Sequence, residues 1–225
     1  MDIKVDNNSF FALDLDDTLY QEIDFLQSAY RFISEQLFPV IGKEIDLEMY
    51  ELYKGKEVVF DKITEKYKLE ISMKTLIDWY RFHTPTINLN EGVATFLQIL
   101  KENDIKISLI TDGRSTTQRN KLKALGIEDL FCDTIISEEF GTEKPNINNF
   151  KFFENKYPSS KFFYIGDNFS KDFVTPNALN WTTIGIKDSG TNIHKQNYDL
   201  QNNYLPHYIC DSFTAINLIF KQKQK

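Results

Sequence analysis

The chain has 225 residues, a length that fits one domain or one domain carrying an insertion. Hydrophobic residues make up 41% of the chain and charged residues 26%, which is the composition of a globular protein with enough apolar material for a core. With 26 Lys and Arg against 33 Asp and Glu, the formal net charge is −7, which argues against nucleic-acid binding through the phosphate backbone.

Five short apolar runs, each bounded by residues typical of turns, predict β-strands. They cover residues 10–13, 105–110, 134–136, 162–165 and 182–186. Their nearly continuous hydrophobicity is typical of strands buried on both faces of a parallel sheet. Amphipathic stretches that predict helices lie at residues 92–101, 115–125 and 147–157. The alternation of strand and helix predicts an α/β fold with a doubly wound, Rossmann-like parallel sheet.

This alternation is interrupted between residues 20 and 86, which carry only helical patterns, such as those at residues 58–67 and 76–80. The interval is much longer than an ordinary connection between a strand and a helix. We therefore expect a helical bundle inserted after the first strand. The sequence thus predicts a core domain made of residues 1–19 and 87–225 and a cap domain made of residues 20–86.

The C-terminal part of the chain is predicted to complete the core. Residues 208–210 predict an edge strand, and residues 212–220 predict a closing helix. The Lys/Gln tail at residues 221–225 is expected to be the frayed end of that helix.

Several classes of protein are excluded by what the sequence lacks. No apolar run approaches the roughly 18 residues of a membrane span, and residues 1–7 carry no signal-peptide core. Cys132 and Cys210 form neither a CxxC pair nor a metal-ligand spacing, so we expect two reduced thiols. These features predict a cytoplasmic protein with no membrane or nucleic-acid partner. No heptad repeat indicates strong oligomerisation, so we expect a monomer or a weak homodimer.

Polar residues follow three of the predicted strands, at the edge where open α/β sheets bind ligands. They are Asp14 and Asp16 after the first strand, Thr111, Asp112 and Gly113 after the second, and Asp167 and Asp172 after the fourth, with Lys144 just before a helix. Carboxylates crowded into one crevice repel each other unless a cation lies between them. Because all these ligands are oxygens, Mg²⁺ is the expected cation.

The same residues can bind and attack a phosphate. The Thr111 hydroxyl, the backbone N–H groups of Asp112 and Gly113 and the Lys144 ammonium would hold its oxygens. One aspartate in line with phosphorus can act as a nucleophile. A second carboxylate two residues further on can act as general acid and base. The pattern predicts a phosphoryl-transfer site.

In this order, Asp14-x-Asp16-x-Thr18, Thr111, Lys144 and Gly166-Asp167-x4-Asp172 resemble the four motifs of the haloacid dehalogenase-like (HAD) hydrolase superfamily. The insertion resembles the type 1 helical cap of its subfamily I. The resemblance implies that Asp14 is the nucleophile and a metal ligand, and that Asp16 is the general acid/base with its carbonyl on the metal. It further implies that Thr111 and Lys144 bind the phosphoryl group, that Asp167 ligates Mg²⁺, and that Asp172 supports the metal shell or Lys144.

The superfamily contains dehalogenases, phosphatases, phosphonatases, phosphomutases and transport ATPases, so the fold alone does not decide the chemistry. Superfamily dehalogenases lack an acid at the position of Asp16, and its presence here favours phosphomonoester hydrolysis. A phosphomutase of the β-phosphoglucomutase type remains an alternative. A protein from a different class, a non-catalytic module that binds a phosphate ligand, is a further alternative.

The expected substrate is a small phosphorylated metabolite, either a nucleotide or a sugar phosphate. The motif residues contact only the phosphoryl group, so the cap should set the specificity. The turn Tyr53-Lys54-Gly55-Lys56 lies where related caps present specificity residues. Arg81 and His83, near the return to the core, are candidates for binding a second anionic group, and Arg114 is a candidate for facing the crevice.

Overall fold

Residues 1–220 are described by a computed structural model. Within this range, the main sheet has six parallel strands in the order β4-β3-β2-β5-β6-β7. They are β2 (Ser9–Leu13), β3 (Lys106–Thr111), β4 (Asp133–Ile136), β5 (Lys161–Gly166), β6 (Thr182–Ile186) and β7 (Tyr208–Cys210). The first five match the five predicted strands, and the parallel α/β fold is confirmed.

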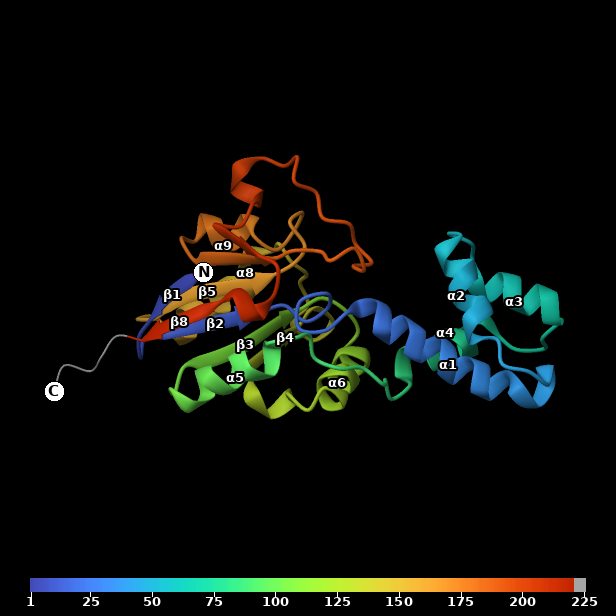
Figure 1. Ribbon diagram of the computed structural model, residues 1–225. Coiled ribbons are helices and arrows are strands. Elements are labelled where there is room, and N and C mark those ends of the chain that lie inside the picture. The colour runs from blue at the N-terminus through green and yellow to red at the C-terminus, as the bar shows by residue number, and fades with distance from the viewer. Residues whose placement is uncertain (221–225) are drawn as a thin grey trace.

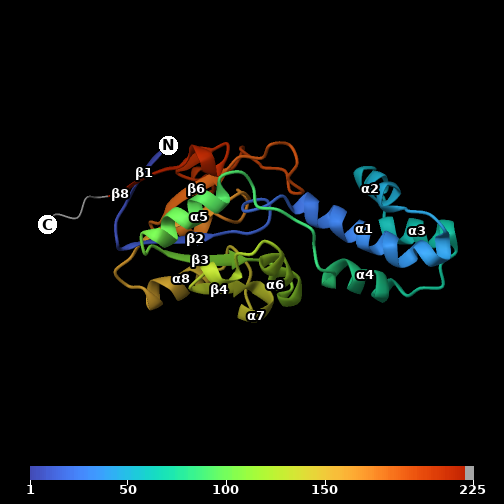
Figure 2. The ribbon, with the colours of Figure 1, turned by 60° about the horizontal axis from the view of Figure 1, so that its bottom comes forward.

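Helices cover both faces of this sheet, with α5 on one side and α8 on the other (Figure 2). The helices of the core are α5 (Val93–Glu102), α6 (Ser115–Ala124), α7 (Ser137–Phe140), α8 (Ile147–Lys156) and α9 (Val174–Ala178). On one face, α5 and α6 contribute Leu97 and Leu122 to a core that includes Leu13 and Ile165. On the other face, α8 contributes Phe150 and Phe153 to an aromatic core. The burial of both faces explains why the strands read as continuous apolar runs.

The position of β2 determines where the polar loops meet. Leu13 at its end pairs with Leu109 of β3 on one side and with Ile165 of β5 on the other. From β2 the chain proceeds to β3 and β4 in one direction, and from β5 to β6 and β7 in the other. Ligand sites in open α/β sheets lie at such a reversal of strand order, outside the carboxyl ends of the strands.

Four helices lie between residues 22 and 82, beside the sheet-containing part of the chain (Figure 1). They are α1 (Glu22–Ile41), α2 (Asp46–Lys54), α3 (Val59–Tyr67) and α4 (Met73–Phe82). They share an apolar core of their own, to which Ile33, Met49 and Ile63 contribute. We refer to these four helices as the cap. Of the predicted turn at residues 53–56, Tyr53 and Lys54 are the last residues of α2, and Gly55 and Lys56 lie between α2 and α3.

The prediction of a closing helix over residues 212–220 is wrong. The chain instead forms a short 3-10 helix, Phe213–Ala215, and then the strand β8 (Asn217–Phe220), which pairs in parallel with β1 (Asp2–Val5). The apolar residues Ile216, Leu218 and Phe220 recur every second position, which is the period of a strand that is buried on one face. The predicted frayed end at residues 221–225 lies outside the described residues.

Two further expectations can be compared with the structure. Cys132 and Cys210 are both free thiols, and Cys210 is buried. Among the described residues, no helix combines the length and the apolar character that crossing a membrane requires.

Candidate functional site

A cavity of about 110 Å³ lies at the carboxyl ends of β2, β3 and β5. Most of the residues that line it follow these strands or lie at the start of the cap. They are Asp14, Asp16, Asp17, Glu22, Thr111, Asp112, Asp167, Asn168, Lys171 and His194. The polar residues predicted at three strand ends therefore meet in one place, and we call this hollow the catalytic cavity.

Asp14 is held at the end of β2 by the backbone and by a buried lysine. Its N–H donates to the carbonyl of Ile165 at 2.9 Å. The Nζ of Lys144, whose side chain is 1% exposed, lies 2.5 Å from Asp14 Oδ1 and 2.8 Å from Asp172 Oδ1. Burial raises the pKa of Asp14 to about 7, although the charge of Lys144 acts in the opposite direction.

Asp14, Asp167 and Asp172 can each offer a carboxylate oxygen within 4.8 Å of the others. Burial raises the pKa of Asp167 well above its usual range, and the charges of Asp172 and Asp14 raise it further. Asp172 is committed to Lys144 and to the backbone N–H of Asn168, which donates to it at 2.9 Å. Both oxygens of Asp172 are thus in polar contacts, whereas Asp14 contacts Lys144 through Oδ1, so Asp14 and Asp167 are the carboxylates that could hold a cation.

These oxygens fit Mg²⁺, which takes hard oxygen ligands and is usually bound through one or two carboxylates. The Thr18 hydroxyl lies 3.4 Å from Asp14 Oδ2 and 3.5 Å from Asp167 Oδ1, between the two carboxylates. The buried Asn192 donates from Nδ2 to Asp167 Oδ2 at 2.8 Å and fixes its orientation. Buried, mutually repelling carboxylates with raised pKa values are the environment that a divalent cation would stabilise.

Asp16 has a separate set of partners, most of which come from α6. Lys121 Nζ donates to Asp16 Oδ1 at 2.6 Å, Gln118 Nε2 donates to Oδ2 at 2.8 Å, and the Tyr20 hydroxyl also donates to Oδ1. Burial by itself would raise the pKa of Asp16, but the charge of Lys121 and these three hydrogen bonds outweigh it and lower the pKa. The environments of Asp14 and Asp16 thus push their pKa values apart: the neutral form is favoured at Asp14 and the ionised form at Asp16.

The same amide links Asp16 to Thr111. Gln118 Nε2 donates to Thr111 Oγ1 at 2.6 Å, so the Thr111 hydroxyl accepts on this side and keeps its own hydrogen for another acceptor. The absence of a side chain at Gly113 leaves space for the Gln118 side-chain amide, because a Cβ at this position would lie 3.1 Å from the Gln118 side chain. The contact explains a glycine after β3 at a φ of 141°.

The loop after β3 differs from the prediction in one respect. The Gly113 N–H, which was expected to bind phosphate, donates to the Ser137 hydroxyl at 2.9 Å. The side chain of Asp112 instead holds two neighbouring loops: it accepts from the backbone N–H of Lys144 at 3.0 Å and from Lys171 Nζ at 2.8 Å. Lys171 is thereby placed in the wall of the catalytic cavity.

Of the cap residues considered from the sequence, His83 does not reach the catalytic cavity. It is 3% exposed, and its ring nitrogens bond the Tyr80 carbonyl at 2.9 Å and the Ser28 hydroxyl at 3.2 Å. Burial lowers the pKa of His83, so it is not an anion-binding cation. Arg81 is also absent from the cavity wall, and Arg114 pairs with Glu138 at 2.6 Å.

Tyr20, Gln118 and Lys121, which contact Asp16, were not predicted as site residues. One signal was present in the predicted helix at residues 115–125, because Gln118 and Lys121 lie three positions apart on one face. A core-facing helix normally places apolar residues there, yet both polar side chains are buried. A buried polar pair on a helix that follows a catalytic strand therefore indicates a contact with the site.

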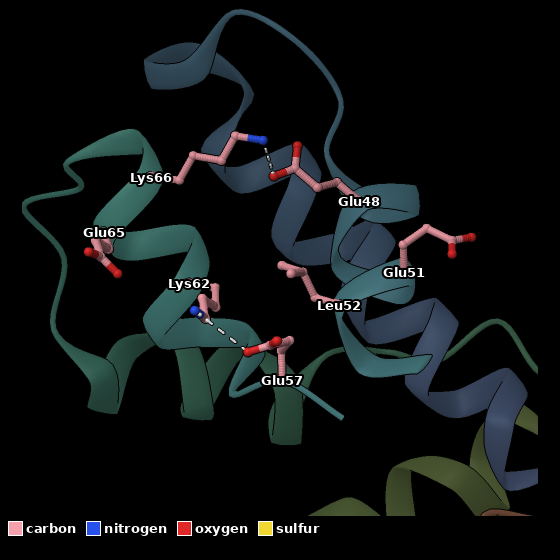
Figure 3. Close-up of a pocket in the computed structure, with 7 residues that line it drawn as sticks. All are labelled: Glu48, Glu51, Leu52, Glu57, Lys62, Glu65 and Lys66. Carbon is pink, nitrogen blue, oxygen red and sulfur yellow. Dashed lines mark hydrogen bonds and ion pairs between the residues drawn. The ribbon is translucent and has the colours of Figure 1, made fainter. Parts of the chain in front are cut away.

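A different hollow, on the cap between α2 and α3, is lined mainly by charged residues (Figure 3). Glu48 pairs there with Lys66 at 2.7 Å, and Glu57 lies 3.6 Å from Lys62. These lysines are about half exposed, and such exposed pairs contribute little free energy. We assign no chemistry to this hollow.

Comparison with known proteins supplies an independent finding. The model of a family described as haloacid dehalogenase-like hydrolase matches residues 11–186. A glyceraldehyde 3-phosphate phosphatase of Methanocaldococcus jannaschii is 29% identical over 188 residues, which cover 77% of this chain and 82% of that protein. The pyrimidine 5'-nucleotidase YjjG of Escherichia coli is 38% identical over 61 residues, 27% of each chain. The crystal structure of a HAD phosphatase from Thermococcus onnurineus has the same fold, with a TM-score of 0.56 at 18% identity over 92% of this chain and 94% of that one.

Proposed function

Because this chain belongs to the haloacid dehalogenase-like hydrolase family and is a hydrolase of phosphoric monoesters, we propose that it is a Mg²⁺-dependent phosphatase of a small phosphorylated metabolite. In this proposal the reaction passes through a phosphorylated Asp14. The observation that carries the proposal is the meeting of Asp14, Asp16, Thr111 and Asp167 in one cavity, with Lys144 buried behind Asp14.

In the first half-reaction, a carboxylate oxygen of Asp14 attacks phosphorus, and the bond from phosphorus to the leaving oxygen breaks. The leaving oxygen takes a proton from Asp16, and the phosphoryl group remains as an acyl phosphate on Asp14. In the second half-reaction, Asp16 takes a proton from water, and the water oxygen attacks phosphorus. Inorganic phosphate leaves and the Asp14 carboxylate is restored.

The neighbours of these groups support their roles. Lys144 holds the Asp14 carboxylate in place, and its positive charge offsets part of the free-energy cost of burying that carboxylate. Thr111, which accepts from Gln118, keeps its hydroxyl hydrogen for a phosphoryl oxygen. Lys121 favours the ionised form of Asp16, which is the base needed in the second half-reaction.

Mg²⁺ would be held by the carboxylates of Asp14 and Asp167 and by the carbonyl of Asp16. When bound, it supplies positive charge next to the phosphoryl oxygens and lowers the repulsion between phosphate and carboxylates. We propose that residues 20–86 act as the cap over this site, on the core of residues 1–19 and 87–225, and that the protein works in the cytoplasm.

The names of the relatives indicate where a substrate search should begin. One acts on glyceraldehyde 3-phosphate and another on pyrimidine 5'-nucleotides. Both are phosphate monoesters of small metabolites, and we propose that this chain acts on the same broad class.

Hydrolysis of p-nitrophenyl phosphate tests the proposal. We expect turnover with Mg²⁺, none in excess EDTA, and a fall of at least ~10³ in Asp14→Asn, because the covalent route is lost. Asp199→Asn, an exposed carboxylate outside the cavity, is the matched control and should keep wild-type activity. Full activity in EDTA, or an Asp14→Asn variant that keeps more than a tenth of the wild-type kcat, would contradict the mechanism.

A further inference from the structure

The cap contains a second hollow, of about 580 Å³, with mainly apolar walls. Its wall comes from all four cap helices: Leu26 and Tyr30 on α1, Tyr53 on α2, Phe60 on α3 and Tyr80 on α4, with Val58 at its rim. We call this hollow the cap groove. It is distinct from the charged hollow between α2 and α3.

The aromatic wall of the cap groove is preformed. The ring centroids of Tyr30, Phe60 and Tyr80 lie 6.2 to 6.5 Å apart in all three pairings, with tilted or edge-on geometry. Such contacts are favourable for aromatic side chains and hold each ring in one orientation. A flat apolar group that enters the groove therefore meets a surface that is already ordered.

One face of α1 carries residues of both the catalytic cavity and the cap groove. Glu22 lines the catalytic cavity, whereas Leu26 and Tyr30 line the cap groove. These residues are spaced four apart and so share a helix face, with Leu26 about 6 Å and Tyr30 about 12 Å beyond Glu22 along the axis. Figure 1 shows α1 leading from the core into the cap. The pKa of Tyr53 is raised by burial and then by the charge of Glu22, as expected for a hydroxyl within electrostatic reach of Glu22.

The charges around the cap groove select against an anionic occupant. Glu57 and Asp61 are part of its wall. A carboxylate or second phosphate on the leaving group would meet like charges there. The groove therefore favours a leaving group that is flat, uncharged and separated from the phosphate by one short spacer.

We propose that the cap groove holds the base of a nucleoside 5'-monophosphate while its phosphate lies at Asp14. This inference rests on the proposed function and narrows its substrate class. The sugar is the spacer that passes Glu22, and the base packs against the wall formed by Tyr30, Tyr53 and Tyr80. A three-carbon ester such as glyceraldehyde 3-phosphate would end before the groove and leave it empty.

The test compares substrates that differ by the base alone. Uridine and adenosine 5'-monophosphates are measured against ribose 5-phosphate, with p-nitrophenyl phosphate as the general substrate. We expect kcat/KM for the nucleotides to exceed that for ribose 5-phosphate by about tenfold or more, the effect of stacking one base on aromatic side chains. Turnover of p-nitrophenyl phosphate without a preference for nucleotides over ribose 5-phosphate would overturn this inference alone. Absence of turnover with every ester would overturn the proposed function together with it.

A pair of surface variants tests the location of the base. Val58→Glu places a charge at the rim of the cap groove, at a side chain that is 64% exposed and so tolerates the change. Leu47→Glu makes the same change at a 75% exposed position of α2 outside the groove. The ratio of nucleotide to ribose 5-phosphate kcat/KM should fall to near one in Val58→Glu, through KM, and stay at the wild-type value in Leu47→Glu. An unchanged ratio in Val58→Glu would overturn the assignment.

Discussion

Replacing Lys121 by Met should destabilise the protein in a way that depends on pH. Lys121 is 4% exposed and lies 2.6 Å from Asp16, which is 18% exposed. Its ammonium is also 4.5 Å from the centroid of the Phe25 ring in α1. Met keeps most of the apolar stem that packs in this position, so the change mainly removes the charge that Asp16 requires.

The size of the effect follows from the burial of the pair. Removing one partner of a buried ion pair costs about 3–5 kcal/mol, because the other charge is left uncompensated. Asp16 can avoid part of this cost by binding a proton, since we expect burial without Lys121 to raise its pKa above its usual range. Between the unfolded pKa and that raised pKa, each pH unit costs about 1.4 kcal/mol, and above the raised pKa the full penalty is reached.

The folding stability of the wild type and that of Lys121→Met should depend on pH in opposite directions. In the wild type, the folded pKa of Asp16 is lowered, so its stabilising effect is present above the unfolded pKa and is lost only as the pH falls through the folded value. In Lys121→Met the folded pKa is raised, so stability is lost as the pH rises through it. We therefore expect a difference of about 1 kcal/mol near pH 5 and about 3 kcal/mol at pH 8.

Urea denaturation followed by circular dichroism at the two pH values measures this difference. Lys123→Met, an exposed lysine on the same helix, is the control and should change the free energy of unfolding by less than about 0.5 kcal/mol at either pH. A loss in Lys121→Met that is equal at pH 5 and pH 8 would refute the reasoning. So would a loss in Lys123→Met of the same size.

Three further variants probe the catalytic cavity. Asp16→Ala should accumulate phosphorylated protein with p-nitrophenyl phosphate, because this good leaving group scarcely needs an acid whereas hydrolysis of the acyl phosphate needs a base. Mass spectrometry detects the phosphorylated protein. Steady turnover near the wild-type rate would assign the acid/base role to another residue. Asp167→Ala should raise the Mg²⁺ concentration for half-maximal activity, measured by titration, and Ca²⁺ should inhibit the wild type because its longer bonds loosen the geometry. Burial, followed by the charge of Asp16, raises the pKa of Glu22 to about 8, so wild-type stability should fall as the pH rises from the unfolded value of 4.5 through 8. Glu22→Gln should then raise Tm by about 2–6 °C at pH 8.5 and change it little at pH 5; equal shifts at both values would exclude the charge as the cause.

The main sheet was predictable because its strands are buried on both faces. Such strands read as continuous apolar runs, and the run at residues 182–186 coincides with β6. The pair β1 and β8 was not predicted. Each strand is four residues long, and they pair across more than 200 residues of chain, as Asp2 and Asn217 do. Such short, half-buried strands carry a weak local signal, and their partner is not visible in the sequence.

Five residues of the catalytic cavity were predictable because each lies at or just after the end of a strand of a parallel sheet: Asp14, Asp16, Thr111, Asp112 and Asp167. They lie at the ends of β2, β3 and β5, and the topology brings those strand ends to one edge. The order of motifs along the chain and the rule for open α/β sheets were sufficient to expect a common site. The roles assigned to these residues remain predictions for the variants described above.

What the sequence determined by itself is therefore the strands of the main sheet, the run of helices between β2 and β3 and the group of residues at the strand ends, all of which depend on local patterns of hydrophobicity and turns. Only the tertiary structure decided the partners of each group. Lys121 and Gln118 of α6 reach Asp16 across more than 100 residues of chain, and the Gly113 N–H is taken by Ser137. The physical reason is that a hydrogen bond or ion pair depends on the distance between two atoms, and packing of the helices sets that distance. Local sequence patterns do not determine this distance.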